Sequence, residues 1–257
     1  MVEDKILRYG RDHPTFKFMA YMLSHAMRIM HSEIYITVMA KIVYETAKAH
    51  TPELSSNTDE NARKLITDTF LPFIQEQFPP IYVDEYLDNN VHAGFSKWSL
   101  DEPDISYAQS MIVSIKPRHI KNLIALSKSP ELKNDYLALL YYNVETVLHE
   151  VGGHHLRRTA DDDNHGTPDT LQTSGMTEGP EAGFYLAYSI HGGRALLVDV
   201  GPKGNNGYKL FEPYLQKKNE KDQMVFAALS TDAIKTMLMG GGLIPWTQTP
   251  CRVDLVL

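Results

Sequence analysis

A short segment near the middle of the chain combines residue types that bind metal ions and transfer protons. It reads His149-Glu150-Val151-Gly152-Gly153-His154-His155. Imidazole nitrogens are common metal ligands, and a carboxylate beside them can act as a general base. The usual motif, H-E-x-x-H, puts two histidines four residues apart on one face of a helix. Here the fourth residue after His149 is Gly153, and His154 follows at the fifth position, which gives an H-E-x-x-x-H spacing.

A regular α-helix cannot direct two histidines with this spacing to one ion. Five residues correspond to about 500° of rotation, so the two side chains point about 140° apart. A π-bulge inserts one residue and brings position i+5 back to the face of position i. Gly152 and Gly153 favour such an insertion, because glycine tolerates unusual backbone angles. Two glycines within a helix cost about 2 kcal/mol relative to alanine, and that cost beside a His-Glu pair indicates a functional site.

The form H-E-x-x-G-H resembles the motif of the dipeptidyl peptidase III family of zinc exopeptidases. In that family a downstream helix carries a glutamate ligand and a second acidic residue, followed by an apolar run that contains tyrosine. A similar stretch here is Thr177-Glu178-Gly179-Pro180-Glu181-Ala182-Gly183-Phe184-Tyr185-Leu186. The two glutamates are closer together than in that family, and the interval between the motifs is shorter. The stretch is therefore more similar to the wider gluzincin group, in which the ligand glutamate lies in an N-E-G or T-E-G-like turn that opens a helix.

This resemblance implies a Zn²⁺ ion held by His149, His154 and Glu178, with one position left open. Glu150 is expected to take a proton from the metal-activated water and pass it to the leaving group. Glu181 is expected to accept the free N–H of a ligand histidine. It is also the alternative third ligand if the following helix begins near it.

Polar side chains after the second motif are candidate stabilisers of a developing oxyanion. They are Tyr185, Tyr188, His191, Arg194 and Tyr208. Tyr185 is assigned to the catalytic set together with Glu150 and Glu181.

Three functions fit these residues. The first is zinc-dependent hydrolysis, most simply of a peptide bond, with Glu150 as base. The second uses the same three ligands for Fe²⁺, because two histidines and a carboxylate also form the facial triad of non-haem iron oxygenases, here with a small hydrophobic substrate. The third is a binding or scaffold protein that keeps the metal helix for stability. Without any metal, the basic residues after Gly153 would complement a helix C-terminus.

The elements that must position these residues are mostly helical. Apolar residues at helical spacing predict helices over 15–50, as one helix or two, and over 59–77, 133–158, 177–191 and 219–239. Strands are predicted over 107–115 and 195–200, and a free edge on the first could hold an extended peptide. The methionines of the first helical region are expected to fill the core.

These elements predict one helix-rich α+β domain over residues 1–257, zincin-like, with a small sheet and a central metal-binding helix. It would have a helical part (1–104), a metal-site core (105–200) and a second helical part (201–257). A hydrophobic fraction of 43% excludes a mainly disordered chain, and the net charge of -7 argues against a nucleic-acid partner. The single cysteine, Cys251, cannot form an internal disulfide, and no apolar run is long enough for a membrane helix. We expect a cytoplasmic protein with a peptide or small-molecule substrate, and the oligomeric state stays open.

Overall fold

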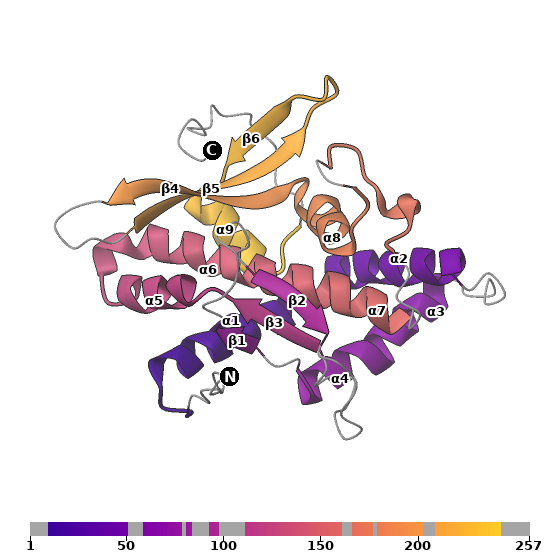
Figure 1. The fold of residues 1–257 in the computed structure, drawn as a ribbon, viewed down its shortest axis with the longest axis horizontal. Helices are drawn as coiled ribbons and strands as arrows, with labels where there is room; N and C mark the ends of the chain where they lie inside the picture. Colours follow the sequence, from indigo (N-terminus) through magenta and orange to yellow (C-terminus); the bar gives the residue numbers. More distant parts are fainter. Residues whose placement is uncertain are drawn as a thin grey trace, which may run out of the picture.

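The His-Glu segment lies on a helix that crosses the middle of the molecule (Figure 1). This helix consists of α6 (Lys133–Val147), a π-helical segment η4 (Leu148–His155) and α7 (Leu156–Ala160). It confirms the helix predicted over 133–158. The computed structural model describes residues 10–50, 59–78, 81–83, 93–97, 111–160, 166–176, 179–202 and 209–242.

The N-terminal helices pack against this central helix. The region predicted to be helical over 15–50 is two helices, α1 (Pro14–Met30) and α2 (Glu33–His50). α1 contacts α6, whereas α2 contacts α7 and α8 (Ala182–His191). Four methionines of these two helices lie in the core, as predicted; they are Met19, Met22, Met30 and Met39.

The helical region predicted over 59–77 is also confirmed, with a local irregularity. It consists of α3 (Asp59–Lys64), a π-helical segment η2 (Leu65–Phe70) and α4 (Leu71–Glu76). Pro72 lies in the first turn of α4, where the missing N–H of proline is tolerated. The remaining helical elements, besides α8, are α5 (Pro117–Leu126), η3 (Pro130–Leu132), η5 (Asp169–Leu171) and α9 (Thr231–Leu238).

A small mixed sheet lies beside the central helix. Its strands are β1 (Ile81–Val83), β2 (Ala93–Lys97) and β3 (Met111–Ile115), in the order β1-β3-β2. β3 pairs in parallel with β1 and antiparallel with β2, and both β2 and β3 contact η4. β3 matches the described part of the strand predicted over 107–115. The sequence left open whether this strand has a free edge for a peptide or is an ordinary buried strand. The structure shows the second, because β3 pairs on both edges and Val113 and Ile115 are buried.

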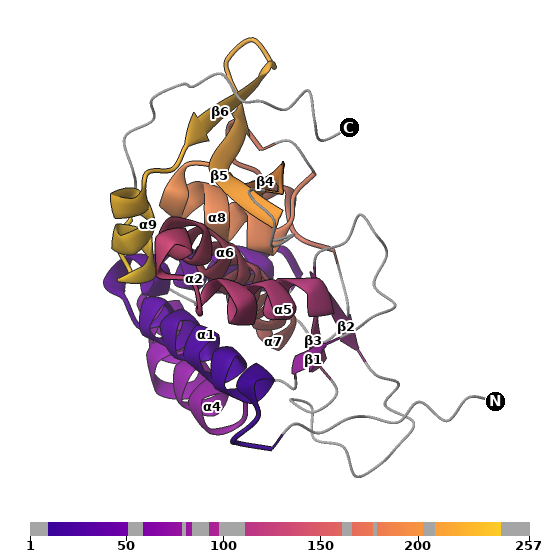
Figure 2. The ribbon, with the colours of Figure 1, turned by 90° about the vertical axis from the view of Figure 1, so that its left-hand side faces the viewer.

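A second sheet is an antiparallel meander of β4 (Arg194–Pro202), β5 (Lys209–Lys218) and β6 (Met224–Ala228) (Figure 2). β4 confirms the strand predicted over 195–200. The helix predicted over 219–239 is wrong in its first part, where the chain turns and forms β6. The Asn219 side chain accepts the N–H groups of Lys221 and Gln223, and this turn joins β5 to β6. The helix begins only after Ser230, whose hydroxyl caps Ala233.

The fold is therefore helix-rich α+β, and its described part shares one hydrophobic core. This core contains residues of α1, α2, β3, α5, α6, η4, α8, β5 and α9. None of the helices in the described ranges is long and apolar enough to span a lipid bilayer.

The central helix and α8 approach each other at two glycines. A Cβ atom on Gly153 would lie 2.4 Å from the Cα of Gly183, and one on Gly183 would lie 2.5 Å from the ring of His149. A side chain at position 153 would therefore push the two backbones apart, and one at position 183 would displace the His149 ring. The glycines of the His-Glu segment thus serve the packing of α8 as well as the π-helical backbone.

We expect Gly153→Ala to destabilise the protein by about 2 kcal/mol. Alanine gains about 1 kcal/mol of helix propensity over glycine, but overpacking against backbone costs about 3 kcal/mol at the upper end of its range. Urea unfolding measures the difference. Gly166→Ala is the control, because a Cβ at position 166 meets nothing within 4 Å. A Gly153→Ala protein as stable as the wild type would contradict this packing.

Candidate metal centre

The π-helical segment brings the two histidines to the same side of the helix. η4 spans Leu148–His155, so the predicted insertion is confirmed and covers more than the glycine pair. The ring centroids of His149 and His154 are 5.1 Å apart, with an angle of 68° between the ring planes. On this π-helical backbone, two histidines five residues apart therefore point to the same side. In an α-helix, histidines four residues apart would do so.

Glu181 brings a carboxylate to this pair. Its Oε2 lies 3.4 Å from His149 Nε2, and its Oε1 lies 2.7 Å from His154 Nε2. The ligand atoms of the three residues all lie within 4.8 Å of one another. Two ligands about 2.1 Å from a tetrahedral zinc ion lie about 3.4 Å apart, which matches the separation of His149 Nε2 and Glu181 Oε2. His154 and Glu181 are closer, at hydrogen-bond distance, so the three donors fit a divalent ion by type, and His154 and Glu181 would have to move apart to bind one.

The carboxylate of Glu181 is also the N-cap of α8. Oε1 accepts the N–H of Gly183 and Oε2 accepts the N–H of Phe184, each at 2.8 Å. Each carboxylate oxygen can accept more than one hydrogen bond, so capping leaves lone pairs for the histidines or a metal ion. The helix begins after Glu181, later than the predicted start at 177. This start places Glu181, the alternative third ligand, beside the histidines; Glu178 lies outside the described residues, and its role stays a prediction.

The charges in this cluster stabilise one another. Burial would raise the pKa of Glu181, but the hydrogen bond from His154, the charges of both histidines and the Gly183 N–H lower it to about 2. Burial would lower the pKa of His154, but its hydrogen bond to Glu181 and the charges of Glu181 and Glu150 raise it above the usual value. In this state a proton on His154 occupies the place between the two side chains that a cation would take.

Glu150 and His149 have pKa values shifted toward their neutral forms. Glu150 is 6% exposed, and burial, helped by the charge of Glu181 and opposed by that of His154, raises its pKa to about 7. Burial lowers the pKa of His149 to about 4, and the charges of His154 and Arg194 also act to lower it. A neutral imidazole is the form that binds a metal ion, and a carboxylate with a pKa near 7 suits a general base.

The described candidate oxyanion stabilisers lie on α8 and at the start of β4. The Arg194 guanidinium lies 4.9 Å from the centroid of the Phe184 ring, which in turn lies 4.8 Å from the His149 ring. Tyr185 follows Glu181 by one helical turn and packs against the core. Tyr188 is buried on α8, and His191 is at the far end of that helix. Tyr208 and Cys251 lie outside the described residues.

The sequence pattern assigned no ligand or catalytic role to two residues near the site. Phe184 packs edge-on against the His149 ring, and its only signal was its position next to the acidic motif. His155 is buried and lies near the rings of Phe70 and Phe73, and burial, with the Arg158 charge, lowers its pKa to about 4. His155 is therefore a neutral core residue beside the site.

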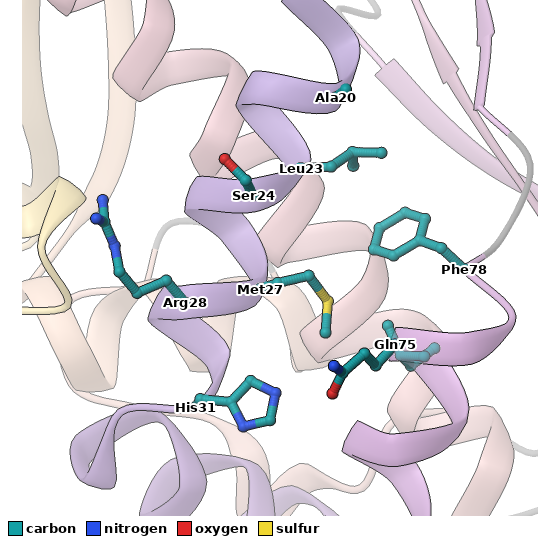
Figure 3. Close-up of a pocket in the computed structure, with 9 residues that line it drawn as sticks. Ala20, Leu23, Ser24, Met27, Arg28, His31, Gln75 and Phe78 are labelled. Atoms are coloured by element: carbon teal, nitrogen blue, oxygen red, sulfur yellow. The ribbon is translucent and has the colours of Figure 1, made fainter. Parts of the chain in front are cut away.

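A hollow of about 440 Å³ lies between α1 and α4 (Figure 3). Leu23, Met27 and Phe78 point toward one another in it. None of the three donors lines this hollow, so the metal centre is a separate feature.

Comparison of the chain with protein-family models, curated proteins and solved structures finds no match. The gluzincin resemblance therefore stays a hypothesis that rests on the two sequence motifs. The geometry of the three donors is independent of it.

We expect His149→Ala and His154→Ala each to remove the bound metal. Each replacement deletes one of three donors, and the two that remain hold a divalent ion too weakly to survive dialysis. Elemental analysis of the purified protein measures the metal content per chain. His31→Ala replaces an exposed histidine of the α1–α2 junction and serves as the control. An unchanged metal content in both site variants would rule out this ligand set.

The third ligand can be identified by replacing each glutamate separately. We expect Glu181→Gln to weaken Zn²⁺ binding at least 100-fold, because the charged donor is lost while the amide oxygen can still cap α8. Glu178→Gln should change the affinity less than three-fold. Titration with a competing chelator measures both affinities. The reverse order would make Glu178 the ligand and Glu181 its neighbour.

Proposed function

We propose that the protein is a metal-dependent hydrolase, most simply a zinc peptidase, in which Glu150 is the general base. His149, His154 and Glu181 would hold the metal ion. When bound, a divalent ion supplies Lewis acidity, which polarises a carbonyl group and acidifies water. All other steps fall to side chains of this chain.

The observation that carries the proposal is the state of the Glu150 carboxylate. It is buried beside the three donors, yet no described residue donates a hydrogen bond to it, whereas Glu181 accepts two from the backbone. A buried carboxylate without donors binds a proton readily. Glu150 can therefore accept a proton from an attacking water and deliver it to a leaving nitrogen.

The arrangement around the central helix supports a zincin-like fold as part of this proposal. The helix α6–η4–α7 carries both histidines, and the sheet β1-β3-β2 contacts η4. The second helix, α8, brings the carboxylate to the histidines from its N-terminal end. A metal helix between a small sheet and a ligand-bearing helix is what the gluzincin resemblance implies.

Iron(II) oxygenase chemistry is the alternative use of the same donors. Two histidines and a carboxylate suit Fe²⁺ as well as Zn²⁺. That chemistry has no need of a buried base next to the metal, so Glu150 favours the hydrolase. Elemental analysis separates the two, because iron together with oxygen consumption and no hydrolysis would support the oxygenase.

We expect Glu150→Gln to keep the metal and to lower hydrolysis at least 100-fold. The amide preserves the shape of the side chain but cannot accept the proton. Mass spectrometry of a peptide pool incubated with the zinc-loaded protein measures cleavage, and metal-stripped protein gives the background. Glu45→Gln is the control, because it removes another buried carboxylate, one paired with Lys41. Undiminished, metal-dependent cleavage by the Glu150→Gln protein would disprove this mechanism.

A further inference from the structure

A second polar cluster lies in the apolar core next to the central helix. It consists of Tyr35 of α2, Glu145 of α6 and His191 of α8, which are 1%, 8% and 1% exposed. The Tyr35 hydroxyl lies 2.7 Å from His191 Nε2 and donates to Glu145 Oε1 at 3.3 Å. His191 Nε2 lies 3.0 Å from the same carboxylate oxygen. We call these three residues the Glu145 cluster.

The Glu145 cluster has few other connections. His191 Nδ1 is buried and has no hydrogen-bond partner among the described residues, so the ring hydrogen-bonds through Nε2 alone within this part of the chain. A buried carboxylate is unfavourable unless donors surround it, and here both donors come from other helices. The contacts of Tyr35, Glu145 and His191 therefore fix α2, α6 and α8 relative to one another.

The position of the cluster relates it to the metal centre. Glu145 precedes His149 by four residues, which is about one helical turn. His191 is the last residue of α8, whereas Glu181 caps its first turn. At one end of α8 its carboxylate meets histidines of η4, and at the other end its histidine meets a carboxylate of α6. A carboxylate–imidazole contact therefore joins each end of α8 to the central helix. At the first end α8 supplies the carboxylate, and at the last end it supplies the imidazole.

The contact between Gly153 and Gly183 lies close to the first of these two ends. Along its length α8 is held by apolar packing, for example of Leu186 and Ile190 in the core, which is non-directional. The Glu145 cluster adds a directional polar contact at the far end of the helix. We propose that the Glu145 cluster is a positioning device, which holds the far end of α8 so that Glu181 stays in register with His149 and His154. This inference rests on the proposed metal site, and Tyr35, Glu145 and His191 act on the metal only through α8.

Tyr35→Phe tests the inference with a minimal change. It removes the hydroxyl that bonds to His191 and Glu145 and keeps the ring. Tyr141→Phe is the matched control, because Tyr141 is equally buried, its ring lies 6.4 Å from the His191 ring, and its hydroxyl has no partner among the described residues. Leu123→Ala, on α5, supplies a core variant that is destabilised without touching the cluster.

We expect Tyr35→Phe and Glu145→Gln to weaken Zn²⁺ binding about 10-fold, the lower end of the range for residues that orient ligands. The visible spectrum of bound Co²⁺, which reports coordination geometry, should change as well. Tyr141→Phe should leave both unchanged. Leu123→Ala should lower the melting temperature with a Zn²⁺ affinity within two-fold of the wild type.

Wild-type affinity and Co²⁺ spectrum in Tyr35→Phe would overturn the inference, as would an equal loss of affinity in Leu123→Ala. If Glu145→Gln fails to fold, Tyr35→Phe still decides the question. Zn²⁺ binding without hydrolysis would refute the proposed function, and the affinities would still decide this inference. A wild-type protein that binds no Zn²⁺ would refute both.

Discussion

The candidate metal centre depends on the wider turn of η4. With α-helical hydrogen bonds His149 and His154 would point about 140° apart, and no movement of α8 could join them. With π-helical bonding over Leu148–His155 their ring centroids lie 5.1 Å apart. A π-helical segment is rare and is frequently found at functional sites. The chain has another, η2, which contributes none of the three donors, so the π-helical backbone alone does not mark a site. The Glu181 carboxylate, the contact between Gly153 and Gly183 and the packing of α8 all complement this one change of backbone geometry.

The close approach of α8 makes the site more than a property of one helix. Because Gly153 and Gly183 lack side chains, α8 can lie against η4 at backbone distance, and its first turn reaches the histidines. Glu181 then satisfies the N–H groups of that turn and the histidines with the same two oxygens. Because Glu181 both caps α8 and contacts the histidines, the position of its carboxylate is fixed by the start of the helix. The capping bonds thereby hold the donor in place before any ion binds.

The sequence was informative where local pattern decides structure. The central helix, its insertion and the end of α8 at Gly192, which has a φ of 76°, all follow from spacing and glycine placement. Contacts between residues far apart in the sequence could not be predicted from local pattern. Tyr35, Glu145 and His191 are separated by long stretches of chain, and none has a motif. The prediction over 219–239 was wrong because all five residues of β6 are apolar and show no alternation in the sequence, so this short strand was merged with α9. The alternation appears only in their burial.

Three carboxyl groups of the candidate metal centre and the Glu145 cluster are buried or half-buried, and each has a different set of hydrogen-bond partners. Glu181 receives two backbone N–H groups and a proton-bearing histidine, so it stays ionised. Glu145 receives the Tyr35 hydroxyl and lies against His191, in the core. Glu150 receives no donor from the described residues, and burial holds its pKa near 7. Only a group that is not already committed to a partner can take up and release a proton at little cost. In the proposed function the acid–base chemistry would therefore fall to Glu150, whereas Glu181 would hold the metal ion and Glu145 connects the helices.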